Sequence, residues 1–228
     1  MVLWGSFVNA MAIVGGALLG RAVKFPDQVQ QTITNGLGLA IAIIGISMGL
    51  ETNNILIPVI ALVLGAVIGE TLKIEGRIAQ VGTALQRRFQ QKTDAAPGFT
   101  QGFLTASVIF CVGAMAVIGG LNSGLRGDHQ VLYAKSMLDG TLTVFLSASF
   151  GLGAGFSALP VFLYQGSIAL LAALVAPILS QPVLEELTAT GGILILGIAL
   201  NMLKLTKIAL GNLLPAIALS VLIAWFFF

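Results

Sequence analysis

The chain of 228 residues is 57% hydrophobic and only 9% charged, whereas a soluble domain carries about 25% charged residues. A chain this apolar cannot cover a water-facing surface, so the composition excludes a soluble globular protein and predicts an integral membrane protein. The formal net charge of +2 and the scattered positions of the basic residues exclude a nucleic-acid-binding protein.

The residues that usually hold metals or disulfides are almost absent. Cys111 is the single cysteine and His129 the single histidine, so the sequence predicts no disulfide framework, no metal site and no cofactor. The N-terminus enters an apolar stretch (MVLWGSFVNAMAIV) without a basic region before it, which predicts a retained helix and not a signal peptide.

The hydrophobic stretches predict an all-α, polytopic membrane protein with about eight transmembrane helices. A bilayer core about 30 Å thick needs about 20 apolar residues per helix. The second and seventh stretches are short, which indicates tilt, burial among neighbouring helices or a partly broken helix. The eight predicted spans are Leu3–Ala22, Gly36–Leu50, Ile55–Leu72, Phe99–Leu121, Leu132–Gly153, Ala158–Leu179, Gly191–Leu203 and Ile208–Phe227.

A polar, basic connector separates the third and fourth spans. It contains GRIAQVGTALQRRFQ, which fits an amphipathic helix on the membrane surface; a solvated connector fits as well.

Eight spans put the odd-numbered connections on one side of the membrane. That side carries nine of the eleven basic residues and is therefore expected to be cytoplasmic, with both termini outside. The nine are Arg21, Lys24, Lys73, Arg77, Arg87, Arg88, Lys92, Lys204 and Lys207.

The chain contains an internal duplication. Residues 8–20 (VNAMAIVGGALLG) and residues 112–124 (VGAMAVIGGLNSG) share seven of thirteen positions at an offset of 104, with two further Val/Ile exchanges. A third, partial copy is indicated by the likeness of NILIPVIAL at 54–62 to NLLPAIAL at 212–219. Self-similarity at a fixed offset is the mark of a repeat architecture.

The duplication predicts four parts. These are a first three-helix repeat (1–72), the cytoplasmic connector (73–98), a second three-helix repeat (99–180) and a two-helix partial repeat (181–228). Three is an odd number, so the second repeat must run inverted relative to the first. Inverted repeats are the recurring plan of secondary transporters, although duplication also builds membrane scaffolds that transport nothing.

Several motifs of the chain are similar to those of one family. They are GSFVNAMAIVGGALLG, NGLGLAIAIIGISM, FCVGAMAVIGGLNSGLRGD, KSMLDG and SALPVFLYQG. On these motifs the chain resembles, over nearly its whole length, the YqgA/YdfK-like family of uncharacterised bacterial inner-membrane proteins, a domain-of-unknown-function family. The resemblance implies a helical protein of the bacterial inner membrane and implies no substrate.

Asp139 is the first candidate for a binding residue, because ionisable groups at membrane depth are costly and usually functional. It lies about 10 Å deep on the fifth predicted span, and Lys135 lies one helical turn earlier on the same face. We expect Asp139 to bind a coupling proton or cation, with Lys135 holding it ionised or exchanging partners. A static ion pair, or a helix cap by Asp139 before Gly140, is the structural alternative.

The duplication extends the candidate site to matched positions. Asn35 corresponds to Asp139, and Thr32 corresponds to Ser136, at the same offset. One charged and one neutral residue at matched positions would form an asymmetric site. The alternative is structural, because Asn before Gly is common at turns and helix ends.

The repeated segments and their neighbours supply four glycines and two asparagines as further candidates for the site. The pairs Gly15-Gly16 and Gly119-Gly120 either allow close helix packing or let a helix unwind and expose its carbonyls. Asn9 and Asn122 would supply side-chain amides beside them. On the sixth predicted span, Tyr164 and Gln165 either line a pathway or bond to a neighbouring helix.

These features favour a secondary transporter or channel for a small solute or ion. The chain has no HExxH and no GxSxG motif and one histidine, so no enzymatic activity is expected. A non-transporting accessory or assembly subunit is the alternative function. The expected partners are the lipid bilayer and a small solute or ion, with no nucleic acid, and the 28 glycines are compatible with a homodimer.

Overall fold

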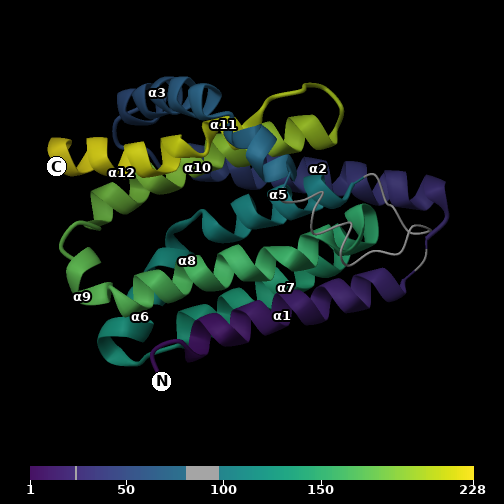
Figure 1. The fold of residues 1–228 in the computed structure, drawn as a ribbon, viewed down its shortest axis with the longest axis horizontal. Coiled ribbons are helices and arrows are strands. Elements are labelled where there is room, and N and C mark those ends of the chain that lie inside the picture. Colours follow the sequence, from purple (N-terminus) through teal and green to yellow (C-terminus); the bar gives the residue numbers. More distant parts are fainter. Residues whose placement is uncertain (24, 81–97) are drawn as a thin grey trace. The chain divides into compact units, whose positions relative to one another are not determined.

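A computed structural model describes residues 1–23, 25–80 and 98–228. The described residues form helices and contain no strand (Figure 1). Five helical segments are long and apolar enough to cross a membrane, or up to seven if each of two bent helix pairs counts as one span. The five are Trp4–Ala22, Gln28–Gly49, Gln130–Leu170, Gln181–Met202 and Leu210–Phe227. The prediction of a helical membrane protein is confirmed, whereas the count of eight spans stays a prediction.

The predicted amphipathic helix of the connector falls mostly on residues 81–97, which lie outside the described residues. Just before them, residues Ile74–Gln80 form a short helix that follows α3 (Leu56–Leu72) at an angle of 56°. Lys73 joins the two in a left-handed backbone conformation, with φ of 51°.

Two helices are much longer than their hydrophobic stretches predicted. α2 (Asp27–Gly49) has 23 residues and α10 (Gln181–Met202) has 22, so neither helix is short or broken. Burial among neighbouring helices, one of the interpretations of the short stretches, holds for α10. Both helices begin with polar turns, DQVQQTITN and QPVLEELTAT, which lie outside the hydrophobic stretches on which the prediction was based. In α10, 78% of the span is buried inside the protein, so its polar residues do not need to face lipid.

The fourth predicted span, Phe99–Leu121, is broken. α5 (Phe99–Cys111) and α6 (Ala114–Arg126) meet at an angle of 60°. Gly113 lies at the break with φ of +115°, a conformation that glycine adopts without the steric penalty of a side chain. The sixth predicted span is also shorter than expected, because α8 (Ala158–Leu170) ends before the short helix α9 (Ala172–Val175).

The described chain forms two compact units that interleave along the sequence. Unit 1 comprises residues 1–34, 80–111 and 115–175, and unit 2 comprises residues 35–79, 112–114 and 176–228. In unit 1, α1 (Trp4–Ala22) lies beside α7 (Gln130–Phe150) (Figure 1). The two helices run in the same direction, since Gly5 lies near Leu132 and Gly20 near Val144.

Glycine allows the close approach of α1 and α7. A Cβ atom on Gly16 would overlap the carbonyl oxygen of Gly140, and one on Gly20 would overlap that of Val144. The hydroxyl of Ser147 donates a hydrogen bond to the carbonyl of Ala17 across the same interface, at 3.0 Å. Small residues spaced by four positions pack helices in this way inside membranes, where burial away from water contributes little to helix association.

The 3₁₀ helix η1 (Gly151–Ser157) connects α7 to α8. α8 runs antiparallel to α1, because Gly166 lies near Leu3 and Gly155 lies near Ala17. α6 runs parallel to α8, with Gly120 against Ile168 and Gly124 against Ala172. It follows that α1 and α6, which carry the two matched sequence segments, run in opposite directions. All these contacts lie inside unit 1.

Unit 2 is built from two antiparallel helix pairs. In the first pair, Gly38 of α2 lies near Leu203 of α10, and Gly49 lies near Ile193. In the second pair, α3 packs against α12 (Pro215–Phe227) and the preceding short helix α11 (Leu210–Leu213). There Gly65 lies near Ala216. α3 and α12 carry the NILIPVIAL and NLLPAIAL segments at their starts, so these matched segments also run in opposite directions.

Candidate functional site

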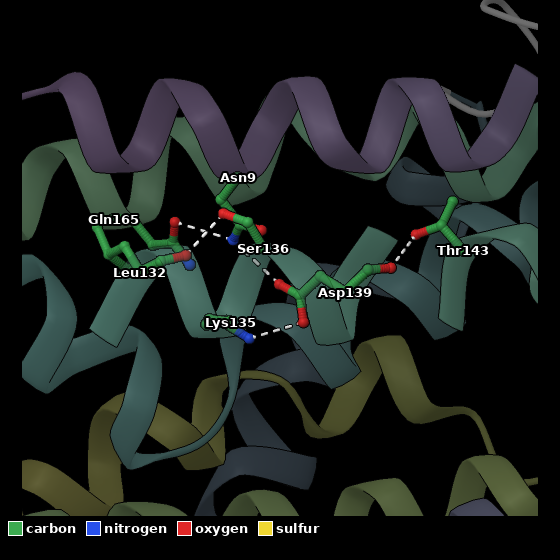
Figure 2. Close-up of polar contacts among 7 residues, drawn as sticks. All are labelled: Asn9, Leu132, Lys135, Ser136, Asp139, Thr143 and Gln165. Atoms are coloured by element: carbon green, nitrogen blue, oxygen red, sulfur yellow. Dashed lines mark hydrogen bonds and ion pairs between the residues drawn. The ribbon is translucent and has the colours of Figure 1, made fainter. Parts of the chain in front are cut away.

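A buried ion pair lies on α7. The ammonium nitrogen of Lys135 is 3.0 Å from Oδ1 of Asp139, one helical turn away, as the sequence predicts. Lys135 is 6% exposed and Asp139 is 5% exposed. Burying two charges costs several kcal/mol per ion unless the geometry and the surrounding hydrogen bonds compensate. The pair therefore depends on what the neighbouring helices supply (Figure 2).

Two amides from other helices complete the network. The Nδ2 group of Asn9 on α1 donates to Oδ2 of Asp139 at 3.0 Å and to Oε1 of Gln165 on α8 at 3.2 Å. Both amide side chains are fully buried. Figure 2 shows Asn9 reaching down from α1 between Gln165 and Asp139. Each oxygen of the Asp139 carboxylate thus accepts a hydrogen bond from a different donor.

The ion pair also lies beside the broken helix. The ammonium of Lys135 sits 5.9 Å from the centre of the Phe110 ring, within the range of a cation–π interaction. Phe110 is fully buried and precedes Cys111, the last residue of α5. The last carbonyls of a helix carry partial negative charge, and the Lys135 cation lies near this C-terminal end of α5.

Three buried polar atoms in this part of unit 1 have no hydrogen-bond partner among the described residues. They are Oδ1 of Asn9, Nε2 of Gln165 and the hydroxyl of Ser6, one turn before Asn9 on α1. A buried unsatisfied polar group costs about 1–3 kcal/mol. The network therefore leaves one acceptor, one amide donor and one hydroxyl unused in the buried interior beside a charge pair.

The hydroxyls nearest the ion pair are satisfied locally. Ser136 donates to the carbonyl of Leu132 at 2.6 Å, and Thr143 donates to the carbonyl of Asp139 at 2.6 Å. Both are bonds to the preceding turn of α7, as is usual for Ser and Thr inside helices. Ser136 consequently lies in the network (Figure 2) without donating to the Asp139 carboxylate.

The remaining polar candidates lie outside the network. Asn35 lies within α2, is exposed and belongs to unit 2, whereas Asp139 belongs to unit 1. Asn122 is half-buried on α6, where its carbonyl accepts the N–H of Asp128. Tyr164 is half-buried on α8 beside Gln165. The structure thus brings together Asn9, Lys135, Asp139 and Gln165, which sequence reasoning had named on three different helices.

The paired glycines lie inside uninterrupted helices. α1 continues through Gly15 and Gly16, and α6 continues through Gly119 and Gly120. Gly15 has no atom within 4 Å of where a Cβ would lie, whereas a Cβ on Gly119 or Gly120 would press on Leu132 or Ile168, respectively.

Glu186 is a buried carboxylate that sequence reasoning missed. It is fully buried on α10 and accepts bonds from the Thr52 hydroxyl at 2.7 Å and from the N–H groups of Asn53 and Asn54 at 2.8 and 2.9 Å. The predicted seventh span began at Gly191, which placed Glu186 in a connection. Ser180 followed by Pro182, a typical helix start, could have revealed it. Among the described residues, no three His, Cys, Asp or Glu side chains gather as a metal site would require.

Comparison with known proteins agrees with this picture. The family described as "Protein of unknown function (DUF554)" matches residues 4–225. The chain is 30% identical to "Uncharacterized protein YqgA" of Escherichia coli (strain K12) over 97% of this chain and 98% of that protein. It is 28% identical to "Uncharacterized membrane protein YdfK" of Bacillus subtilis (strain 168) over 94% and 93%, respectively. No solved structure matches. From the extent of these matches, the chain belongs to the DUF554 family of membrane proteins.

Proposed function

We propose that this protein is a secondary transporter or channel that moves a small solute or ion across the bacterial inner membrane, and that the Asn9–Lys135–Asp139–Gln165 network is its binding site. The observation that carries the proposal is the buried Lys135–Asp139 pair, which the Asn9 amide of α1 links to the Gln165 amide of α8 and which unpartnered polar atoms accompany. An apolar replacement of a buried ion pair is often neutral or stabilising, so stability alone gives little reason to keep such a group.

The roles of the residues follow from their contacts. Asp139 binds the coupling proton or cation, because its carboxylate is the buried anion of the network. Lys135 compensates its charge at 3.0 Å and exchanges partners when a cation or proton takes its place. Asn9 and Gln165 present an unpartnered acceptor and an unpartnered donor to the polar groups of the solute.

The broken α5–α6 helix supports this assignment. Discontinuous helices in secondary transporters expose backbone carbonyls and helix ends to the bound ion. In this chain the 60° bend directly follows Phe110 and Cys111, and Phe110 contacts Lys135. The Lys135–Asp139 pair is thereby in contact with the end of one half of a discontinuous helix.

The helix directions also support the proposal. α1 and α6 run in opposite senses in unit 1, and α3 and α12 do so in unit 2. Each pair carries two matched sequence segments, and inverted repeats require that matched segments run in opposite directions. Alternating access then follows from rocking one repeat against the other around a fixed midplane site. The proposed topology keeps the basic connections cytoplasmic and both termini outside.

The proposal is tested by flux into liposomes. Purified protein is first screened by melting temperature against ions, amino acids and organic acids, because a bound ligand stabilises the folded state in proportion to its concentration over its affinity. Each stabilising solute is then measured for flux. Asp139→Asn is expected to abolish flux, whereas Thr141→Val, an exposed substitution on the same helix, is expected to retain it. Equal flux through both variants would overturn the assignment of Asp139.

The same screen examines the second candidate function. An accessory or assembly subunit would show no melting shift with any solute and would co-purify with a partner protein in fixed proportion. That result would overturn transport and leave the membrane fold as described.

A further inference from the structure

An apolar groove opens in unit 1 between α1 and the η1–α8 segment. Its volume is about 440 Å³, which lies within the range of ligand-binding pockets, roughly 300–1,000 Å³. Its lining combines small residues with larger apolar side chains. The lining residues are Val14, Ala17, Leu18, Leu152, Gly155, Phe156, Ala158 and Leu159.

The glycine-rich 3₁₀ segment explains why the groove forms. η1 reads GLGAGFS, so its glycines bring no side chain to fill the space beside α1. A Cβ on Gly155 would overlap the Cβ of Ala17. At the rim, Leu18 and Leu159 are each 60% exposed, so the groove is open to its surroundings along its length.

The position of the groove within the spans determines which solvent it meets. Val14, Ala17 and Leu18 lie inside the candidate span Trp4–Ala22, and Leu159 lies inside the candidate span Gln130–Leu170. Apolar side chains at such depth face the hydrocarbon of the bilayer. A groove of this kind accommodates an extended acyl chain, because an acyl chain has no polar group that would lose its contact with water on binding.

A basic residue lies at the end of the groove. Arg21 follows Leu18 by three residues and Ala17 by four, so it lies on the same face of α1, one turn nearer the end of the helix. It is exposed in the last turn of α1. Arginine binds phosphate through two parallel hydrogen bonds. Its side of the membrane is the one that the charge distribution predicts to be cytoplasmic, where anionic lipids attract basic residues.

We propose that this groove binds one anionic phospholipid, with an acyl chain between α1 and η1–α8 and the phosphate group at Arg21. The site is independent of the proposed transport function, because none of its lining residues belongs to the Lys135–Asp139 network. Bound there, the lipid fills the space between α1 and the η1–α8 turn, whose continuations carry Asn9 and Gln165.

The test uses the full-length protein, purified and stripped of lipid in detergent. Phosphatidylglycerol and phosphatidylcholine with identical acyl chains are added separately, and both the melting temperature and the number of retained lipids by native mass spectrometry are recorded. Arg21→Gln removes the phosphate contact, and Leu159→Trp fills the groove. The matched controls are Arg126→Gln, a basic residue at the end of α6, and Leu163→Trp, an exposed residue one turn further along α8.

The wild type and both controls are expected to retain one phosphatidylglycerol and to melt at a higher temperature with it than with phosphatidylcholine. Arg21→Gln is expected to bind phosphatidylglycerol about fivefold more weakly, the effect of one basic residue near an anionic surface, and Leu159→Trp is expected to lose the bound lipid. Retention by Leu159→Trp equal to that of Leu163→Trp would overturn the groove. If Arg21→Gln preferred phosphatidylglycerol over phosphatidylcholine as strongly as the wild type does, the phosphate contact would be overturned. Loss of a dimer in Leu159→Trp without any lipid dependence would assign the groove to a second copy and overturn the proposal.

Discussion

Asp139 in unit 1 and Glu186 in unit 2 are both buried carboxylates on long helices, yet their partners are of different kinds. Glu186 accepts a hydroxyl and two backbone N–H groups from residues 52–54, immediately before α3. Two of those donors are backbone N–H groups, whose positions the chain fixes, and the third is the Thr52 hydroxyl. Asp139 instead faces a side-chain cation and a side-chain amide, both of which can change rotamer.

The difference supports the proposed assignment of Asp139 as a binding carboxylate and of Glu186 as a structural one. Glu186 holds the α2–α3 connection against α10 through its bonds to residues 52–54. Around Asp139, part of the bonding capacity of Asn9 and Gln165 is unused. Burial alone therefore does not distinguish the two acids; the proposed role of Asp139 rests on its side-chain partners and on their unused bonding capacity. The following substitutions, in order of decreasing effect on stability, test this contrast.

The largest effect is expected at the ion pair. Asp139→Asn leaves the Lys135 cation buried without its counter-charge and should lower the free energy of unfolding by about 3–5 kcal/mol. The double variant Lys135→Met/Asp139→Asn removes both charges and should recover most of that loss while remaining inactive in flux. Unfolding in mixed detergent with increasing dodecyl sulfate measures both variants. Additive losses in the double variant would show that the two residues do not compensate each other.

A smaller loss is expected at Glu186. Glu186→Ala leaves the N–H group of Asn53 without its acceptor and the N–H group of Asn54 with only the Thr52 hydroxyl, at 3.2 Å. The expected cost is about 2–3 kcal/mol. Solute flux per folded molecule should be unchanged. Glu185→Gln is the control, since Glu185 bonds with the side chains of Asn53 and Gln181 at a less buried position. A Glu186 variant that stays folded and loses flux would make Glu186 part of the site.

The smallest loss of stability is expected at Asn9. Asn9→Leu removes the donor shared by Asp139 and Gln165 and should cost about 1–2 kcal/mol, while flux falls sharply because the solute-binding amide is gone. Asn122→Leu is the matched control, because Asn122 lies on α6 outside the network. If Asn122→Leu reduced flux as much as Asn9→Leu, the site would extend to α6, and the network would be incomplete as described.

The sequence predicts the components of this site better than their arrangement. Lys135 and Asp139 could be paired from their spacing, because a helix fixes which residues share a face. That Asn9 reaches both the Asp139 carboxylate and the Gln165 amide depends on tertiary packing across 130 to 156 positions, which no local pattern records.

Helix boundaries were predicted well where hydrophobicity and helix coincide and poorly where they do not. α1 and α3 agree with their predicted spans within one residue at each end. α2 and α10 extend by a further nine or ten residues into polar sequence, because hydropathy measures contact with lipid and not helix length. The break at Gly113 was missed because the residues on both of its sides are apolar.

The contact between Asn9 and Asp139 has a consequence for how the protein is made. The two residues are 130 positions apart, so at about 5–20 residues per second α1 leaves the ribosome roughly 7–26 s before α7 exists to receive it. During that interval the Asn9 amide must be tolerated in the bilayer without its native acceptor. A chain that stopped after α3 would be apolar enough to insert, but it would contain neither unit in finished form. Assembly of the helices therefore has to wait until the second half of the chain has been delivered to the membrane.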